Sequence, residues 1–394
     1  MKYLRSVGNG KIILNPIALL ILLSVTCSSC QKKINVTPNS TNSDTLINRS
    51  SPVNQPQLIE TEYQVVNNTR ITLSSYVYAP SIAKSNVIGK LYPDTLIKRF
   101  FLSKSDSLNF YIKGDSLYLT STGEYRLKTE GQLDVNLLFV DIIKKKKTLR
   151  ILCDRFSHNK IIAHRGAWRA LNYPYDSLVS LARAMSLGCE ASEFDVWMTT
   201  DKVLVVNHDP TIGGMQIETS NYNDLINNVK LSNGEKLPTL KEYISLAMTQ
   251  QITSLELEIK PSEISAGRRL EIADSVISVV HQLKAQAWTR YTCFDYNVLQ
   301  KLKKDDVNAR TAFINGTTIP YTPAVLKYMG IWGFTYSDSV LGTNPAQYIS
   351  DAHKLGINTV ISTTDNTTNF KYYLSINVDG IMTDNPELLL TLVK

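Results

Sequence analysis

A chain of 394 residues with a formal net charge of +7 is longer than one ordinary domain of about 150 residues, so we expect more than one folded region. Hydrophobic residues make up 43% of the chain and charged residues 20%, a globular composition that excludes a disordered chain. Positions 1–29 hold three basic residues and no acidic ones, so the rest of the chain carries +4, too little to indicate a nucleic-acid-binding protein.

The first thirty residues have the composition of an export signal. Basic residues precede the apolar stretch "IILNPIALLILLSV", and small residues lead to Cys30 in "TCSSC". This ending resembles the lipobox of bacterial lipoproteins, in the form common in Bacteroidetes, whose cysteine is lipidated. The alternative is an uncleaved membrane anchor, but the stretch is short and contains Asn15 and Pro16. We expect residues 1–29 to be a signal peptide and the exported chain to be anchored to the cell envelope through Cys30.

A polar segment follows the signal. Residues 30–57 are rich in Asn, Ser, Thr and Pro and nearly lack aromatic residues, so they cannot bury enough surface to order themselves. We expect a flexible tether. Three cysteines lie beyond it, at positions 153, 189 and 293, and this odd, widely spaced set indicates neither a disulfide framework nor a metal site.

Residues 58–155 are predicted to form a small all-β sandwich without helices. In "LNFYIKGDSLYLTS", apolar residues alternate on both sides of Gly114-Asp115, which is typical of a hairpin. Further short strands are predicted in "ETEYQVV", "ITLSSYVYA", "SNVIGKLY", "EYRLKT" and "LDVNLLFVDI". The order of these segments loosely resembles a cadherin-like or immunoglobulin-like domain. The acidic calcium motifs of cadherins are missing, so calcium bridging is not implied.

Four consecutive lysines, Lys144 to Lys147, form the one dense basic run of the chain. Such a run can touch anionic headgroups or substrates. The more ordinary interpretation is a solvated turn or strand edge.

Residues 156–394 alternate short apolar runs with helical stretches, which predicts a parallel sheet. The strand candidates are "KIIAH", "ASEFDV", "VLVVNH", "SLELEIK", "AWTRYTCF", "NARTAFIN", "IWGFTYS", "INTVIST" and "VDGIMTD". Helices are expected in "SLVSLARAMSLG", in "PTLKEYISLAM" with Pro238 in its first turn, and in "NPAQYISDAHKLG". The size fits a (β/α)8 TIM barrel. The alternative, a doubly wound open sheet, lacks the Gly-rich first loop of a nucleotide site.

Three carboxylates are predicted to converge at the ends of neighbouring barrel strands. Glu193 and Asp195 are two residues apart on one strand and therefore share a face, and Glu258 ends the next barrel strand. Like charges at this range need a cation. An oxygen-only ligand set suits one divalent ion, Mg²⁺ or Ca²⁺, better than zinc.

Cations and imidazoles occupy corresponding positions at the strand ends. Arg165 and Lys260 add positive charge beside the carboxylates, which suits an anion such as phosphate. His164 and His208 can take a proton from a nucleophile and give one to a leaving alkoxide. Together these residue types indicate phosphodiester cleavage. Asp384 ends the last strand and has two interpretations, a member of the site or a helix cap.

Five segments in order resemble the motifs of the glycerophosphodiester phosphodiesterase family, whose fold is a (β/α)8 barrel: "HRG", "SEFDVWMTTDKVLVVNHDPTIGG", "LSNGEKLPTL", "LELEIK" and "VDGIMTDNPELL". The resemblance covers about 160 to 394. It implies that His164 and His208 are catalytic and that Arg165 and Lys260 contact phosphate. The metal carboxylates that it implies are Glu193, Asp195 and Glu258.

The chain departs from the family pattern twice. Asp176-Ser177 stands where Asn-Ser is usual, and Ser362-Thr363 stands where a Trp-Thr pair is frequent. The first change adds a carboxylate near the site, and the second removes a ring expected beside the glycerol moiety. Both bear on substrate identity more than on reaction type.

We therefore expect metal-dependent hydrolysis of glycerophosphodiesters, the deacylated phospholipid headgroups, to glycerol 3-phosphate and an alcohol. One alternative is a phospholipase-type phosphodiesterase that acts on intact or lyso lipids. The other is a catalytically weak phosphodiester-binding protein. The membrane, reached through the lipid on Cys30, is the expected partner, and the oligomeric state is left open.

Overall fold

The computed structural model describes residues 62–66, 70–93, 97, 99–315, 320–337 and 339–393. All of them belong to one unit of the chain, Gln57–Lys394. The predicted signal peptide, the lipidated Cys30 and nearly all of the tether lie outside the described residues. Within the described ranges, no helix is long and apolar enough to cross a bilayer.

The first part of the described chain forms two β-sheets. One sheet has the strand order β1-β9-β8-β5, with β3 also paired to β9, and the other has the order β2-β4-β7-β6. Both sheets contribute buried side chains, such as Leu117 and Val135, to one apolar core. The strands are β1 (Gln64–Val65), β2 (Thr72–Leu73), β3 (Val77–Tyr78), β4 (Val87–Tyr92), β5 (Phe100–Leu102), β6 (Phe110–Lys113), β7 (Ser116–Leu119), β8 (Gln132–Val140) and β9 (Lys144–Cys153).

The predicted hairpin around Gly114-Asp115 is confirmed. Lys113 at the end of β6 pairs with Ser116 at the start of β7, so Gly114 and Asp115 form the loop between the two strands. Gly114 has φ +62, in the left-handed region that glycine adopts without strain. Phe110 and Leu117 are buried, as the alternation predicts.

The expectation of an all-β region is wrong at one point, because "EYRLKT" lies in the helix α1 (Ser121–Glu130). The side chain of Thr120 accepts a hydrogen bond from the Gly123 N–H, and Gly131 ends the helix with φ +84. These are the usual start and stop residues of a helix. A short 3-10 helix, Asp106–Leu108, also lies in this region.

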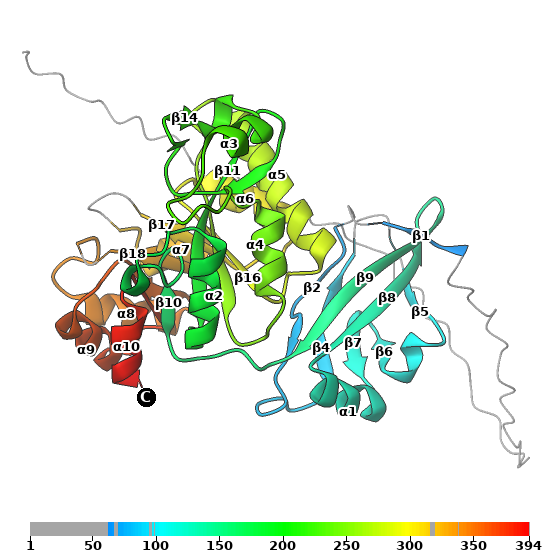
Figure 1. The fold of residues 1–394 in the computed structure, drawn as a ribbon. Helices are drawn as coiled ribbons and strands as arrows, with labels where there is room; N and C mark the ends of the chain where they lie inside the picture. The colour runs from blue at the N-terminus through cyan, green and yellow to red at the C-terminus, as the bar shows by residue number, and fades with distance from the viewer. Residues whose placement is uncertain are drawn as a thin grey trace, which may run out of the picture. The chain divides into compact units, whose positions relative to one another are not determined.

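The second part of the described chain is a closed barrel of eight parallel strands. Each strand pairs with the next, and β10 closes the ring by pairing with both β11 and β20. The barrel strands are β10 (Ile161–Ala163), β11 (Ala191–Met198), β15 (Ser254–Ile259), β16 (Thr289–Cys293), β17 (Thr311–Ile314), β18 (Gly333–Tyr336), β19 (Asn358–Ile361) and β20 (Gly380–Thr383). The (β/α)8 prediction is therefore confirmed, and closure excludes the open sheet (Figure 1).

One further predicted strand, β12 (Leu204–Val206), lies outside the ring and pairs antiparallel with β11. This pairing turns the chain back along β11 and returns residues 207 and 208 to the level of Asp195, because the Asn207 N–H donates to the Asp195 carbonyl. A small hairpin follows, formed by β13 (Thr211–Ile212) and β14 (Met215–Gln216).

Helices alternate with the barrel strands and begin at polar capping residues. Ser177 and Thr239 each form a capping box at the start of a helix. Thr239 is thus the cap of its helix and Pro238 precedes it, so the first-turn position predicted for Pro238 is wrong. The helices are α2 (Leu178–Leu187), α3 (Tyr222–Asn228), α4 (Leu240–Ala247), α5 (Ala266–Leu283), α6 (Tyr296–Asp305), α7 (Pro323–Tyr328), α8 (Pro345–Lys354), α9 (Thr367–Ser375) and α10 (Pro386–Val393), with 3-10 turns at Arg169–Leu171 and Ile217–Thr219.

Candidate active site

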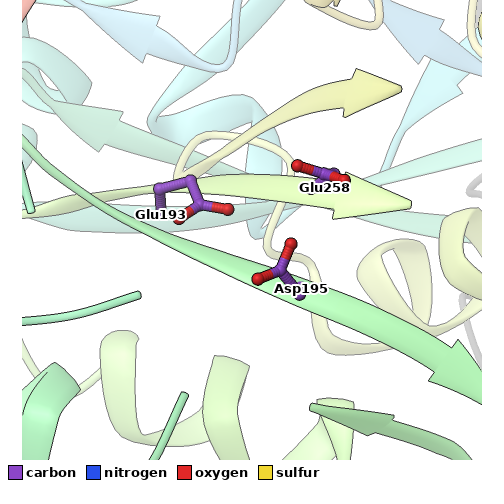
Figure 2. A group of neighbouring side chains, drawn as sticks. All are labelled: Glu193, Asp195 and Glu258. Atoms are coloured by element: carbon purple, nitrogen blue, oxygen red, sulfur yellow. The ribbon is translucent and has the colours of Figure 1, made fainter. Parts of the chain in front are cut away.

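Three buried carboxylates meet at the carboxyl ends of β11 and β15. Glu193 and Asp195 lie on one face of β11, and Asp195 pairs directly with Glu258 of β15 in the strand register. One oxygen from each of the three side chains lies within 4.8 Å of the others. Figure 2 shows the three groups converging from the two strands. The two-residue spacing on β11 and its pairing with the next strand produce this convergence.

Burial and mutual repulsion make these carboxylates hard to ionise. Burial, and then the charges of Asp195 and its neighbours, raise the pKa of Glu193 well above its ordinary value. The same causes raise the pKa of Glu258 to about 7. A cluster with such properties is stabilised by any positive charge placed against it.

Lys260 and Arg165 supply part of that charge. Lys260 Nζ lies 2.8 Å from Asp195 Oδ1 and 2.6 Å from Glu258 Oε1. Burial alone would lower the pKa of Lys260, but these two carboxylates raise it. Arg165 Nε lies 3.7 Å from Asp195 Oδ2. The backbone of Arg165, at φ +55, directs its N–H to Glu193 Oε2 at 2.9 Å.

His164 follows β10 and is oriented by a carboxylate. Its Nδ1 lies 2.7 Å from Asp384 Oδ1. Because an ionised carboxylate only accepts hydrogen bonds, Nδ1 carries the proton and Nε2 presents its lone pair in the neutral ring. Nε2 lies 4.0 Å from Glu193 Oε2. His164 therefore borders the carboxylate cluster with its proton-accepting nitrogen on the cluster's side.

His208 follows β12 and has an equivalent arrangement. Its Nδ1 lies 2.7 Å from Asp209 Oδ1, and its carbonyl accepts a hydrogen bond from the Trp197 indole at 3.1 Å. Burial lowers the pKa of His208, and Asp195 opposes this shift while Lys260 adds to it. The hydrogen bond from the Asn207 N–H to the Asp195 carbonyl places the adjacent His208 at the same rim as the carboxylates. The lowered pKa favours the neutral form of the imidazole.

The carboxylate cluster has the properties of a hard-cation site. Both carboxylate oxygens of Asp195 and Oε1 of Glu258 are buried without a well-aligned hydrogen bond, although Lys260 is close enough for ion pairing. Three convergent oxygen donors fit Mg²⁺ or Ca²⁺, which prefer carboxylate ligands. The residues present therefore fit a divalent cation at Glu193, Asp195 and Glu258.

Asp176 extends the acidic cluster beneath the rim. It is 1% exposed, and its Oδ1 accepts a hydrogen bond from the Asp195 N–H at 3.3 Å. Burial, followed by the Asp195 carboxylate, raises its pKa well above the ordinary value. The adjacent Ser177 caps α2. The Asp176-Ser177 pair, which stands where Asn-Ser is usual in the family, thus places a fourth carboxylate next to Asp195 and keeps the helix cap.

Several residues at this rim were not singled out by sequence reasoning. The indole N–H of Trp168 donates to Asp384 Oδ1 at 3.2 Å. The Tyr175 hydroxyl donates to Asp209 Oδ2 at 3.4 Å, and the Arg165 guanidinium lies over the Tyr175 ring at 5.4 Å. Asp384 belongs with the site, since its carboxylate orients His164. Its position at the end of the last barrel strand was the available signal.

The rim of this barrel gathers three carboxylates, two cations and two carboxylate-bound imidazoles, a set of groups that defines a hydrolase-type site. Residues 164–388 match the sequence model of the glycerophosphoryl diester phosphodiesterase family. This match covers more than half of the chain, and the chain belongs to that family. It is an enzyme, a glycerophosphodiester phosphodiesterase, as the sequence motifs predict.

Relatives and solved structures agree with this assignment. The chain is 24% identical over 252 residues to a glycerophosphodiester phosphodiesterase of Caldanaerobacter subterraneus subsp. tengcongensis, a match that covers 59% of this chain and 97% of the relative. It is 32% identical, with a TM-score of 0.57, to the structure of a glycerophosphodiester phosphodiesterase from Parabacteroides distasonis, over 60% of this chain and 98% of the other. A phosphodiesterase of Oleispira antarctica, solved in complex with the product sn-glycerol-3-phosphate, shares the fold at 21% identity and a TM-score of 0.52, over 59% and 96% of the two chains.

Proposed function

We propose that this enzyme hydrolyses glycerophosphodiesters to glycerol 3-phosphate and an alcohol with the help of one divalent cation, Mg²⁺ or Ca²⁺. The observation that carries the proposal is the arrangement of Glu193, Asp195 and Glu258, whose oxygens converge within 4.8 Å beside a pair of cations and two carboxylate-oriented imidazoles. The product bound to the Oleispira antarctica enzyme supports the choice of glycerol 3-phosphate.

Arg165 and Lys260 are proposed to bind the phosphodiester group. Both lie against Asp195, at 3.7 and 2.8 Å, so their positive charge is concentrated at the mouth of the cluster. A divalent cation bound by the three carboxylates would supply further positive charge to stabilise the negative charge that develops on the phosphoryl oxygens. If that cation took the place of Lys260 beside Asp195 and Glu258, the ammonium group of Lys260 would be available to the substrate.

His164 and His208 are proposed to move the protons. In each ring Nδ1 is held by a carboxylate at 2.7 Å, which leaves Nε2 for the reaction. One imidazole takes a proton from the attacking hydroxyl as the new P–O bond forms. The other gives a proton to the leaving alkoxide as the old P–O bond breaks. The same two groups serve for attack by water and for attack by a substrate hydroxyl through a cyclic phosphate.

The test is turnover of a headgroup panel by the purified chain. The panel contains glycerophosphocholine, glycerophosphoethanolamine and glycerophosphoinositol, with intact and lyso phospholipids, each assayed with and without a chelator. We expect release of glycerol 3-phosphate that stops on chelation and in His164→Ala. Preferential turnover of intact lipids would favour a phospholipase, and tight binding without turnover in any condition would favour a sensor.

We also propose that the chain is a lipoprotein of the cell envelope, lipidated at Cys30 after removal of residues 1–29, and that residues 58–155 form a cadherin-like or immunoglobulin-like spacer. The apolar signal and the small residues before Cys30 support the lipoprotein. Mass spectrometry of the mature N-terminus tests this proposal. A diacylglyceryl cysteine at position 30 is expected, and retention of Met1 would contradict it.

A further inference from the structure

The hairpin that joins β8 to β9 exposes aliphatic side chains at its tip. Ile142 is 89% exposed, and Val140 and Ile143 are 49% and 48% exposed. Three large aliphatic residues are thus exposed within four positions, whereas exposed apolar residues are ordinarily scattered singly on protein surfaces. In Figure 1 this loop extends past the sheet beside β1. We call residues 140–143 the hairpin tip.

Lysines follow the hairpin tip directly. Lys144 and Lys145 begin β9 and pair with Glu62 and Asp141, and the side chain of Lys144 is about half exposed. The side chains of Lys144 and Glu62 are 51% and 47% exposed, and an ion pair so exposed contributes little to stability. Long lysine side chains can lie along an apolar surface while their ammonium groups reach polar headgroups. The basic run therefore lies next to the apolar tip, as expected if the aliphatic side chains enter a lipid layer and the lysines remain at its headgroups.

The described chain begins beside the same hairpin. Glu62 pairs with Lys144, and in the short strand β1 Gln64 pairs with Lys145 and Val65 with Lys146. Val65 is itself 58% exposed. The first described residues, 62–65, thus lie beside the hairpin tip.

We propose that the hairpin tip docks onto an anionic lipid bilayer, with Val140, Ile142 and Ile143 in the interfacial layer and Lys144 and Lys145 among the headgroups. Stable attachment of a protein to a membrane usually combines a lipid with a second contact, often a basic one. The tip would supply that second contact, and it lies beside the first described residues of the chain. The inference goes beyond the proposed chemistry and does not depend on it.

An environment-sensitive fluorophore tests the docking in the chain that lacks the signal and carries Cys30→Ser, so that neither Cys27 nor Cys30 is present. The variant Ile142→Cys of this chain is labelled with a nitrobenzoxadiazole dye, since the remaining cysteines, Cys153, Cys189 and Cys293, are buried. The matched control is Tyr125→Cys on α1, where the side chain is 72% exposed. Because α1 ends just before β8 starts, the control lies at the far end of a nine-residue strand, about 30 Å from the tip.

With phosphatidylglycerol vesicles we expect a blue shift at position 142, quenching by brominated acyl chains, and neither effect at position 125. No shift at position 142, or equal shifts at both positions, overturns the docking. A shift at position 142 without vesicles, together with a dimer in analytical ultracentrifugation, assigns the tip to a second copy of the chain and also overturns it. An equal response to neutral phosphatidylcholine vesicles contradicts the role of the lysines.

A second measurement uses loss of binding. In the protein without its lipid, obtained with Cys30→Ser after removal of the signal, Ile142→Asp combined with Ile143→Asp is expected to weaken partitioning onto anionic vesicles by about tenfold or more. Turnover of a soluble glycerophosphodiester should be unchanged, which separates this inference from the proposed function. Unchanged partitioning of the double variant would refute the proposal.

Discussion

Replacement of Lys260 by methionine should destabilise the metal-free enzyme more than any surface charge change. Lys260 is the cation in closest contact with two buried carboxylates, at 2.8 and 2.6 Å. Removal of one partner from a buried ion pair costs about 3–5 kcal/mol. We expect the low end, about 3 kcal/mol, because Glu258, whose pKa is already raised to about 7, can take up a proton instead of remaining an uncompensated charge.

Thermal unfolding in a chelator measures this loss. For a barrel of this size, about 3 kcal/mol corresponds to a Tm lower by about 6–12 °C. The matched control is Lys202→Met, which breaks the exposed pair between Lys202 and Glu271, 2.6 Å apart with side chains 65% and 37% exposed. That change should cost at most about 1 kcal/mol.

Addition of Mg²⁺ completes the experiment. A divalent ion at the cluster replaces the missing positive charge, so saturating Mg²⁺ should raise the Tm of Lys260→Met more than that of the wild type. The reasoning is refuted if Lys260→Met unfolds at the same temperature as Lys202→Met in chelator. It is also refuted if Mg²⁺ stabilises the variant and the wild type equally.

Three other changes have defined outcomes. Asp384→Asn should lower kcat by about 100-fold or more with little change in KM, because His164 loses the carboxylate that fixes its tautomer; steady-state kinetics with an unchanged kcat would contradict this role. Asp176→Asn should stabilise the metal-free protein at pH 7 by about 1–3 kcal/mol. The folded form of Asp176 keeps its proton to a higher pH than the unfolded form, so this gain should disappear in melts below pH 4, and a gain independent of pH would be inconsistent with it. Lys147→Met should stabilise at pH 7 by about 3 kcal/mol, since burial lowers the pKa of Lys147 from 10.5 to about 8. Between pH 8 and 10.5 only the unfolded wild type keeps Lys147 protonated, so the wild type regains stability as the pH rises through this range. Urea melts in which the difference in unfolding free energy between Lys147→Met and the wild type stays constant up to pH 10 would contradict this prediction.

The barrel was predictable because its strands are short apolar runs, and several of them end at or next to a charged residue or a histidine. Glu193, Asp195 and Glu258 converge because a two-residue spacing and parallel neighbours leave no other geometry. His208 reaches the same rim through the antiparallel strand β12, whose apolar run was visible in the sequence although its direction was not. The order of the motifs along the chain therefore contained most of the site.

Other features were missed, some because a local signal was overlooked and some because local patterns do not hold the information. The segment "EYRLKT" was predicted as one of several short strands, but it lies in α1, where Tyr125 is 72% exposed and Leu127 is buried. The capping residues Thr120 and Gly131 indicated a helix. The basic run was predicted to be solvated, but Lys147 is 1% exposed, because its position in β9 points it into the protein.

Pairings between residues distant in sequence were hidden, although Asp384 itself was noted at the end of the last strand. Asp384 lies 220 residues from His164, and no spacing rule connects them. The place of Asp176 behind Asp195 follows from its backbone at φ +55, which turns the side chain toward β11 rather than toward solvent. Such positions are set by the closed ring and the loops above it, so only the three-dimensional fold reveals them.

The central claim is that a divalent cation held by three carboxylates and two flanking imidazoles together cleave the phosphodiester. The most direct test combines isothermal titration of Mg²⁺ or Ca²⁺ with turnover of glycerophosphocholine, for the wild type, Glu193→Gln and the pair His164→Ala and His208→Ala. We predict one ion bound by the wild type, much weaker binding in Glu193→Gln, and wild-type ion binding without turnover in each histidine variant. Full turnover in a chelator, or a histidine variant that retains wild-type kcat, would contradict the account.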